Sequence, residues 1–380
     1  MCDISFKTNT MTMNRLYFSI VKSISLLLYV AQVSSQPSPI LLKNAAVSNT
    51  FFPWVGAGSG GYTGNSSQPY GAYPECFNGC EDPECIIPDS PTFSGCGEYV
   101  DSSISTWLQL GGRRIDSADS YHNQFYAGRA VRASSVSRQD IFVVSKVGPY
   151  LPLGYNDTLT QFSNILTSTG LDYVDLVLIH WPDCLGGGGV TGCLAANSSD
   201  PVCQYSQSSY NAAKCRLNTW DALVTIFKSG KARAIGVSNF NSTNLQEIKD
   251  AGRPLPSVNQ IPFYIYHSSV QSDTIAWCNA NNVLVNGYSP FGVPDRKTFQ
   301  PPMSITPLVD PIVLSIAATH KTTPANVILA WHYSLNIPFN PRSQNAAHQL
   351  ENLGSGSTLP WWNLNLSQSE LTALNTRPQA

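Results

Sequence analysis

Short apolar runs alternate along this chain with stretches of helical length. Three of the runs end in an ionisable side chain, at Asp116, Lys146 and His180. In a (β/α)8 barrel the carboxyl ends of the parallel strands meet at one face, and that face carries the functional site. The pattern therefore predicts that a carboxylate, an ammonium group and an imidazole come together there. Tyr121 follows Asp116 by five residues and adds a phenol to the same region.

The remaining runs extend the alternation of strands and helices. The first strand is expected at Phe52–Gly58, where it ends in a glycine-rich turn. Later strands are expected at 234–239, 258–261, 283–288 and 337–340, and helices at 98–110, 123–134, 156–170, 219–229 and from 242. About eight such units predict the α/β class and a (β/α)8 TIM barrel.

Two stretches rich in Gly, Pro, Ser and Asn interrupt this alternation, at about 62–97 and 183–218, and are predicted insertions at the carboxyl-end face of the barrel. Each holds four cysteines, namely Cys76, Cys80, Cys85 and Cys96 in the first, and Cys184, Cys193, Cys203 and Cys215 in the second. Disulfides are the expected staples because these stretches cannot build a core of their own. Zinc is the alternative, but paired C-x2-C spacing and an interleaved histidine are missing, so we expect no metal. Three pairings stay open in each group. Cys278 is expected to be a buried free thiol on a helix.

Residues 1–36 have the pattern of a signal peptide. The basic residues Lys7, Arg15 and Lys22 precede a short apolar run at 24–33, and the small residues Ser34 and Ser35 follow it. A buried strand or an uncleaved anchor is the alternative. Five N-x-S/T sequons point to the same pathway, at Asn65, Asn156, Asn197, Asn241 and Asn365. We therefore expect a secreted or lumenal glycoprotein with a barrel over 37–380 and no membrane attachment after cleavage.

Composition and charge narrow the range of partners. The 380 residues carry a net charge of −2, and only 12% of them are charged, against about 25% in an ordinary soluble domain. A basic patch and an acidic tail are both missing from the sequence, so we expect no nucleic-acid partner. The expected protein is a monomer whose partner is a small molecule.

From about Phe52 to its C-terminus the chain resembles the aldo-keto reductase superfamily. The matching motifs occur in the family's order, at Asp116 with Tyr121, Lys146, Leu178–Pro182, Ile235–Phe240, Val258–Gln260 and Tyr288–Gly292. A single motif match is weak, whereas the ordered set is specific. The resemblance implies a barrel that reduces an aldehyde, ketone or sugar carbonyl to an alcohol with NAD(P)H.

The resemblance also implies a role for each residue of the set. Tyr121 would protonate the carbonyl oxygen while hydride reaches the carbon. Lys146, paired with Asp116, would lower the pKa of the phenol by placing positive charge beside the phenolate. His180 would orient the carbonyl, and Trp181 would line the substrate pocket. Donors aimed at an oxygen that gains negative charge stabilise the transition state, which supports these roles on physical grounds.

For the cofactor, the resemblance implies NADPH, with NADH as the alternative. The carboxamide would be bound by Ser238, Asn239 and Gln260, and Tyr288 would stack on the nicotinamide ring. The loop over the pyrophosphate would include Ser289, Phe291, Gly292 and Asp295. The implied contacts around the adenosine are Arg342, Ser343, His348, Glu351 and Asn352.

Three positions depart from the family's pattern. Arg342 stands where the family usually has lysine, which preserves the charge. His348 stands where it commonly has arginine, and a neutral imidazole binds an anion less well. Gly60 replaces a pocket tryptophan and indicates a wider pocket.

Two other functions remain as alternatives. One is a secreted binding or structural glycoprotein that has kept the barrel without catalysis. The other is an alcohol dehydrogenase that runs in the oxidising direction with Tyr121 as the base. The joint presence of Asp116, Tyr121, Lys146 and His180 argues against the first.

Overall fold

The computed structural model describes residues 36–44, 50–60, 95–121, 123–148, 152–184, 198–292, 306–355 and 359–378. By contacts the chain divides into two compact units, Met1–Ser38 and Pro39–Ala380, and the second holds every described helix and strand. The expected signal peptide and most of the first cysteine-rich stretch lie outside the described residues.

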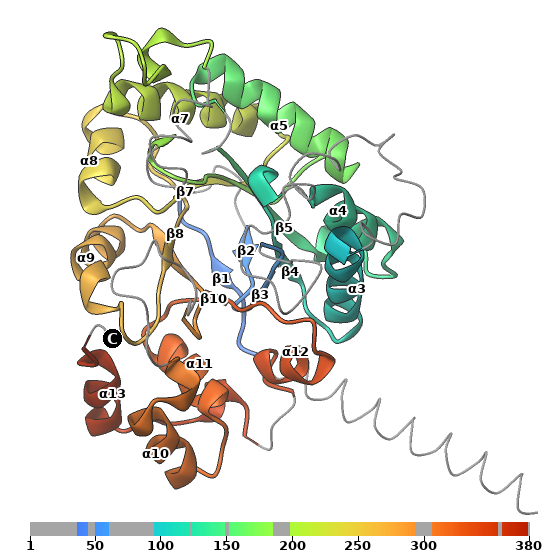
Figure 1. The fold of residues 1–380 in the computed structure, drawn as a ribbon, viewed down its shortest axis with the longest axis vertical. Helices are drawn as coiled ribbons and strands as arrows, with labels where there is room; N and C mark the ends of the chain where they lie inside the picture. The colour runs from blue at the N-terminus through green and yellow to red at the C-terminus, as the bar shows by residue number, and fades with distance from the viewer. Residues whose placement is uncertain are drawn as a thin grey trace, which may run out of the picture. The chain divides into compact units, whose positions relative to one another are not determined.

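A closed ring of parallel strands forms the centre of the second unit (Figure 1). Its members are, in order, β3 (Gly56–Gly58), β4 (Arg114–Asp116), β5 (Phe142–Val147), β6 (Leu176–Ile179), β7 (Ile235–Ser238), β8 (Val258–Pro262), β9 (Leu284–Tyr288) and β10 (Phe339–Asn340). The ring closes between its first and last strands, because Val55 bridges Phe339 in parallel and the Gly58 amide donates to the Pro341 carbonyl at 3.0 Å. The (β/α)8 barrel predicted from the sequence is confirmed.

Helices surround the strands (Figure 1). They are α3 (Gly95–Gln109), α4 (Gln124–Ala133), α5 (Tyr155–Thr169), α7 (Ala212–Lys228), α8 (Ser242–Asp250), α9 (Ser272–Ala280), α10 (Pro311–Thr319), α11 (Pro324–Ser334), α12 (Ala346–Asn352) and α13 (Gln368–Asn375). Local sequence sets their ends: Asn241 caps α8 in a capping box with Asn244, and Gly170 ends α5 with a φ of 62°. Among the described residues, no helix has the length and apolar character needed to cross a membrane.

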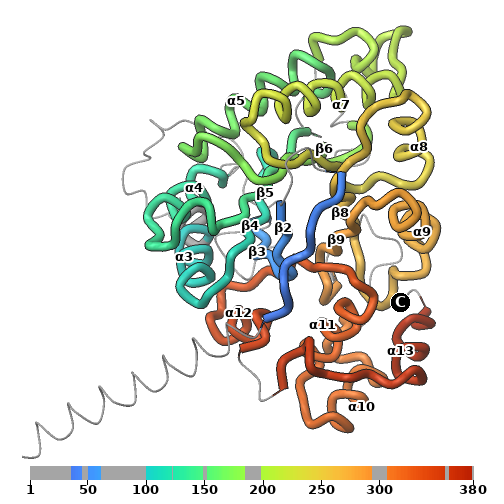
Figure 2. Tube along the Cα trace, turned by 180° about the vertical axis from the view of Figure 1, so that it is seen from behind, coloured from blue at the N-terminus to red at the C-terminus, as the bar shows by residue number. Residues whose placement is uncertain are grey.

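The alternation of side chains along each strand divides the core in two. Outward-facing residues such as Ile115, Val143 and Val177 pack under the helices. Inward-facing apolar residues form a separate cluster at the amino ends of the strands, made of Leu42, Phe52, Phe142, Val144, Leu176, Leu178, Ala234 and Val258. We call this set the inner apolar cluster. Two of its members come from the antiparallel pair of β1 (Ile40–Leu41) and β2 (Phe51–Phe52), because Leu42 directly follows β1 and Phe52 ends β2. This pair crosses the barrel strands in Figure 2.

Two expected elements were wrong. The strand expected at Phe52–Gly58 is divided between the hairpin and the barrel, because β2 ends at Phe52 and β3 begins at Gly56. Pro53, which cannot donate a ladder hydrogen bond, stands at the break. The helix expected from residue 219 begins at Ala212, since Asn211 caps it through the Lys214 amide. The last residues assigned to the second insertion are therefore helical.

Candidate active site

The predicted site residues lie at the carboxyl ends of adjacent strands. Asp116 is the last residue of β4, Lys146 is the fifth residue of β5, and His180 directly follows β6. Lys146 shares the inward face of β5 with Phe142 and Val144, two members of the inner apolar cluster. The same alternation that packs the lower barrel therefore presents polar groups at its upper end.

Lys146 lies between a carboxylate and a phenol. Its Nζ donates to Asp116 Oδ1 at 2.5 Å, to the Ser117 carbonyl at 2.9 Å and to Tyr121 Oη at 3.4 Å. The lysine side chain is fully buried and that of Asp116 is 5% exposed. Tyr121 reaches this position from the 3-10 helix η1 (Asp119–Tyr121), directly after β4. The three groups predicted to act together are in contact.

The electrostatics of Lys146 follow from this pairing. Burial alone would lower the pKa of its ammonium group, but the charges of Asp116 and Tyr121 and the hydrogen bonds to them raise that pKa above the ordinary value of 10.5. The lysine is therefore charged at neutral pH, and its charge stabilises a phenolate at Tyr121.

Asp116 has further partners that the sequence did not reveal. Its Oδ2 accepts from Gln260 Nε2 at 2.6 Å and from Asn340 Nδ2 at 2.9 Å. Beneath it, the fully buried Arg114 donates to Asn286 Oδ1 at 3.1 Å. Arg114 precedes Asp116 by two residues on β4, so both side chains point into the barrel. Strand alternation alone could have predicted the inward position of Arg114. The position of Asn340 also depends on the strand register that pairs it with Tyr288.

His180 is held from three sides. Ser120 Oγ lies 3.1 Å from its Nδ1, and the Tyr121 ring packs edge-on against the imidazole with centroids 5.5 Å apart. Asn239 Nδ2 donates to the His180 carbonyl at 2.8 Å. Only 9% of the histidine is exposed. Ser120 was not among the residues expected at the site, and nothing in its sequence context marks it.

Gly60 lies against the Tyr121 ring. A Cβ built on Gly60 would stand 2.8 Å from Tyr121 Cζ, closer than side chains approach one another. The Gly60 carbonyl accepts from Arg342 Nη1 at 3.1 Å. A glycine here thus leaves space for the phenol, and its backbone connects the phenol's surroundings to Arg342.

The residues expected at the nicotinamide form one connected group at the ends of β7, β8 and β9. Ser238 Oγ donates to the Gln260 carbonyl at 2.9 Å, and Tyr288 Oη donates to Asn239 Oδ1 at 2.9 Å. Asn239 has a φ of 62°, which turns its amide away from the strand direction. Gln260 Nε2 donates to Asp116, so this group is in direct contact with one of the residues expected to act in catalysis.

The residues expected at the adenosine lie after β10. Arg342, His348 and Glu351 are exposed or half-buried, whereas Asn352 is 4% exposed. The Ser343 carbonyl accepts from Ser103 Oγ at 2.9 Å, which ties this segment to α3. On the loop expected over the pyrophosphate, Ser289, Phe291 and Gly292 are described, with Ser289 at a φ of 54°. Asp295 lies outside the described residues.

A disulfide and an ion pair hold the described part of the second cysteine-rich stretch in place. Cys203 and Cys215 form a disulfide, and Cys184 is also disulfide-bonded. Arg216 pairs with Glu247 through two hydrogen bonds of 2.8 Å. Cys278 is buried and free, as predicted. The remaining six cysteines lie where side chains are not described, namely Cys2, Cys76, Cys80, Cys85, Cys96 and Cys193.

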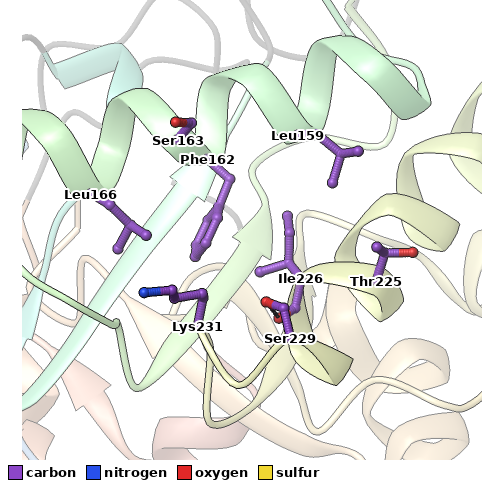
Figure 3. Close-up of a pocket in the computed structure, with 8 residues that line it drawn as sticks. All are labelled: Leu159, Phe162, Ser163, Leu166, Thr225, Ile226, Ser229 and Lys231. Carbon is purple, nitrogen blue, oxygen red and sulfur yellow. Dashed lines mark hydrogen bonds between the residues drawn. The ribbon is translucent and has the colours of Figure 1, made fainter.

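A shallow groove elsewhere on the molecule is not a competing site. It runs between α5 and α7 on the outside of the barrel (Figure 3). Its walls are mainly apolar, with Leu159, Phe162, Leu166 and Ile226 among them. No paired acid and base lines it. Within the described ranges, no cluster of His, Cys, Asp and Glu could hold a metal ion.

Comparisons with known proteins agree with this geometry. Residues 98–374 match the model of the aldo/keto reductase family. The chain is 32% identical over 269 residues to aldo-keto reductase family 1 member A1-A of Danio rerio, covering 69% of this chain and 78% of that protein. It is also 32% identical over 263 residues to morphine 6-dehydrogenase of Pseudomonas putida, covering 69% and 79%. Among solved structures, silkworm (Bombyx mori) aldo-keto reductase AKR2E5 complexed with NADPH has a TM-score of 0.67 and 25% identity, covering 91% of this chain and 89% of that one.

Proposed function

The chain belongs to the aldo-keto reductase family and is an NAD(P)H-dependent carbonyl reductase of that type, and we propose that Tyr121 is its proton donor, with NADPH as the preferred cofactor. The observation that carries the assignment of Tyr121 is the contact of its hydroxyl with Lys146, whose ammonium is paired with Asp116.

The donor set fits a nicotinamide. Hydroxyl and amide groups of Ser238, Asn239 and Gln260 gather at the strand ends beside Lys146, and a carboxamide needs such donors and acceptors. The exposed cation Arg342 suits a phosphate. The silkworm structure with NADPH supports the choice of NADPH. When bound, the reduced nicotinamide supplies the hydride that the carbonyl carbon accepts.

The chain's own residues handle the proton. Tyr121 gives its hydroxyl proton to the carbonyl oxygen as negative charge develops there. Lys146 balances the phenolate that is left, and Asp116 keeps the ammonium charged and in place. His180 donates a hydrogen bond to the same oxygen and orients it. Half-buried Trp181, next in the chain, lines the substrate pocket.

The direction of the reaction has an alternative that the relatives favour in part. Morphine 6-dehydrogenase and a glycerol 2-dehydrogenase (NADP(+)) of Saccharomyces cerevisiae are similar to this chain. In the oxidising direction Tyr121 would act as the base on an alcohol, with the same neighbours. The ratio of reduced to oxidised cofactor decides the direction. Lys146 serves both directions, because the phenolate that it stabilises is what reduction leaves behind and what would act as the base in oxidation.

The test is turnover of purified protein with NADPH or NADH and a panel of aldehydes, ketones and sugars. We expect loss of reduced-nicotinamide absorbance with at least one carbonyl, and faster with NADPH. Binding of each nucleotide is measured separately by quenching of tryptophan fluorescence. Failure of both nucleotides to bind would contradict the cofactor assignment, whatever the substrate panel contains.

We further propose that residues 1–36 are a cleaved signal peptide and that the barrel, over 37–380, is a secreted or lumenal monomeric glycoprotein. The Cys203–Cys215 disulfide supports an oxidising compartment. Asn156, Asn241 and Asn365 are all exposed, as glycan acceptors must be. The two cysteine-rich stretches are proposed as walls of the substrate pocket.

N-terminal sequencing of protein from the culture medium tests this assignment. We expect a new N-terminus near Gln36, a mobility shift on removal of N-linked glycans, and a monomer mass in light scattering. Protein retained in the cytosol with its first residue at Met1 would overturn it.

A further inference from the structure

Ser120 occupies a defined position beside the catalytic groups. It lies in η1 between Asp119 and Tyr121, is 6% exposed, and places its Oγ 3.1 Å from His180 Nδ1. Tyr121 and Ser120 thus reach the same imidazole from one turn, the first through its ring and the second through its hydroxyl. A hydroxyl hydrogen-bonded to Nδ1 decides whether Nε2, the other ring nitrogen, carries a proton.

A neutral imidazole carries a single proton, on either Nδ1 or Nε2, and the hydrogen bond made by one nitrogen decides which. If Ser120 donates to Nδ1, the proton lies on Nε2, which can then donate to a carbonyl oxygen. If Nδ1 donates to Ser120, Nε2 has only a lone pair to present, and a lone pair repels the oxygen of a carbonyl.

We propose that Ser120 is a positioning residue that donates its hydroxyl proton to Nδ1 of His180 and so keeps His180 in the Nε2–H tautomer. In this tautomer it is Nε2 that carries the proton to be donated to the carbonyl oxygen. This inference rests on the proposed function in one respect, the role of His180 as a donor to the carbonyl oxygen.

Hydrogen bonds hold the segments that carry both partners, so the contact is a built feature of the fold. The η1 turn is anchored where Gln124 Nε2 donates to Asp119 Oδ1 at 2.9 Å, and Ser145 Oγ in turn donates to Gln124 Oε1 at 2.6 Å. The His180 amide donates to the Val147 carbonyl at 3.0 Å. Neither residue can shift without breaking a buried hydrogen bond.

The charged groups around this contact have partners of their own. Lys146 contributes a fully buried ammonium group, which contacts the same Tyr121 ring that packs on the imidazole. Asp116 lies on the far side of that lysine and is paired with it, and Asp119 turns to Gln124.

Ser120→Val and Ser120→Thr form a matched pair for the test. Valine and threonine have the same shape, but only threonine keeps a hydroxyl that can donate to Nδ1. The primary readout is the tautomer of His180 in ¹⁵N-histidine-labelled protein, read by long-range nitrogen–proton NMR without substrate. The chain has six histidines, and a His180→Gln variant identifies the resonance.

We expect wild type and Ser120→Thr to carry the proton on Nε2, and Ser120→Val to lose that preference. In carbonyl reduction, Ser120→Val should lower kcat about tenfold, as for one lost hydrogen bond, and Ser120→Thr should restore it. The nucleotide Kd from fluorescence quenching should stay unchanged in both variants.

A wild-type spectrum with the proton on Nδ1 would overturn the proposal by itself, even if Ser120→Val failed to fold. So would a Ser120→Val enzyme with wild-type kcat and an unchanged tautomer. These outcomes are distinct from a failure of the proposed function, because the tautomer is read without turnover. A protein that reduces no carbonyl but shows the Nε2–H form would overturn the function and leave the role of Ser120 standing.

Discussion

The interior of the barrel has two regions built on the same strands. At the amino ends the inner apolar cluster fills the barrel, and at the carboxyl ends polar side chains fill it. Strand β5 shows both, because Phe142 and Val144 belong to the cluster while Lys146, on the same face, donates to Asp116. The regions thus differ in the chemistry of a few positions and share their backbone geometry.

The two regions are held together by different forces. The cluster gains its stability from area removed from water, which depends little on direction. The polar region depends on matched partners: Asp116 accepts from Lys146, Gln260 and Asn340, and removing any one leaves buried groups unsatisfied. We therefore expect changes in the lower region to affect stability alone and changes in the upper region to affect chemistry.

The largest effect is expected from Asp116→Asn. The change keeps the shape but leaves the fully buried Lys146 without its counter-charge. Breaking a buried ion pair in this way costs about 3–5 kcal/mol of unfolding free energy. Urea unfolding measures the loss, and carbonyl reduction should disappear with it. Unchanged stability and turnover would show that the Asp116–Lys146 ion pair contributes neither to stability nor to catalysis.

The pH dependence of the same variant has a definite sign. In wild type the pKa of Lys146 is raised, so its contribution to stability is complete below the unfolded value of 10.5 and is lost only as pH rises through the higher folded value. Without Asp116, burial lowers that pKa instead. The unfolded chain then binds more protons, and stability should increase with pH up to 10.5, by at most about 1.4 kcal/mol per pH unit. Unfolding curves from neutral pH upward should show that increase in the variant, and wild type serves as the control.

A comparable loss of stability without loss of chemistry is expected from Phe142→Ala in the lower region. Phe142 is 5% exposed and packs edge-on against Phe52 at 5.2 Å. Truncation should cost about 3–5 kcal/mol, and the control Phe142→Leu less. The kcat per folded molecule should match wild type. A kcat that falls with stability would break the division between the two regions.

A smaller effect is expected from Asn340→Leu, which removes one of the partners of Asp116. Gln260 and Lys146 still hold the carboxylate. The Asn340 Oδ1 is buried without a hydrogen-bond partner, so removing this oxygen relieves a desolvation penalty and offsets part of the lost stability. We expect a kcat about tenfold lower and a stability change of about 1 kcal/mol. Steady-state kinetics and urea unfolding measure both, and a wild-type kcat would show that Asn340 has no part in positioning Asp116.

The sequence predicted the parts of this structure that rest on strand period and on motif order. Asp116, Lys146 and His180 were placed correctly because each closes an apolar run whose alternation fixes the face of its side chain. Composition was less reliable. The cysteine-rich stretch concealed the start of α7, where an asparagine cap at Asn211 was the better signal.

The remaining features depend on pairing across the sheet or on a single turn. Asn340 reaches Asp116 only because β10 closes the barrel beside β3. Ser120 meets His180 because η1 turns it toward β6, and no pattern in a single chain reports such a turn. Contacts between distant strands therefore set the details of the site, while local pattern sets its frame.

Tyr121 delivers the proton in the proposed reaction, and the variant Tyr121→Phe tests this role. The variant removes one hydroxyl and keeps the ring that packs on His180. Reduction of the best carbonyl should fall by about 10²–10⁴-fold, with NADPH binding by tryptophan fluorescence quenching and the thermal midpoint both close to wild type. Turnover that survives in Tyr121→Phe, with nucleotide still bound, would contradict the claim.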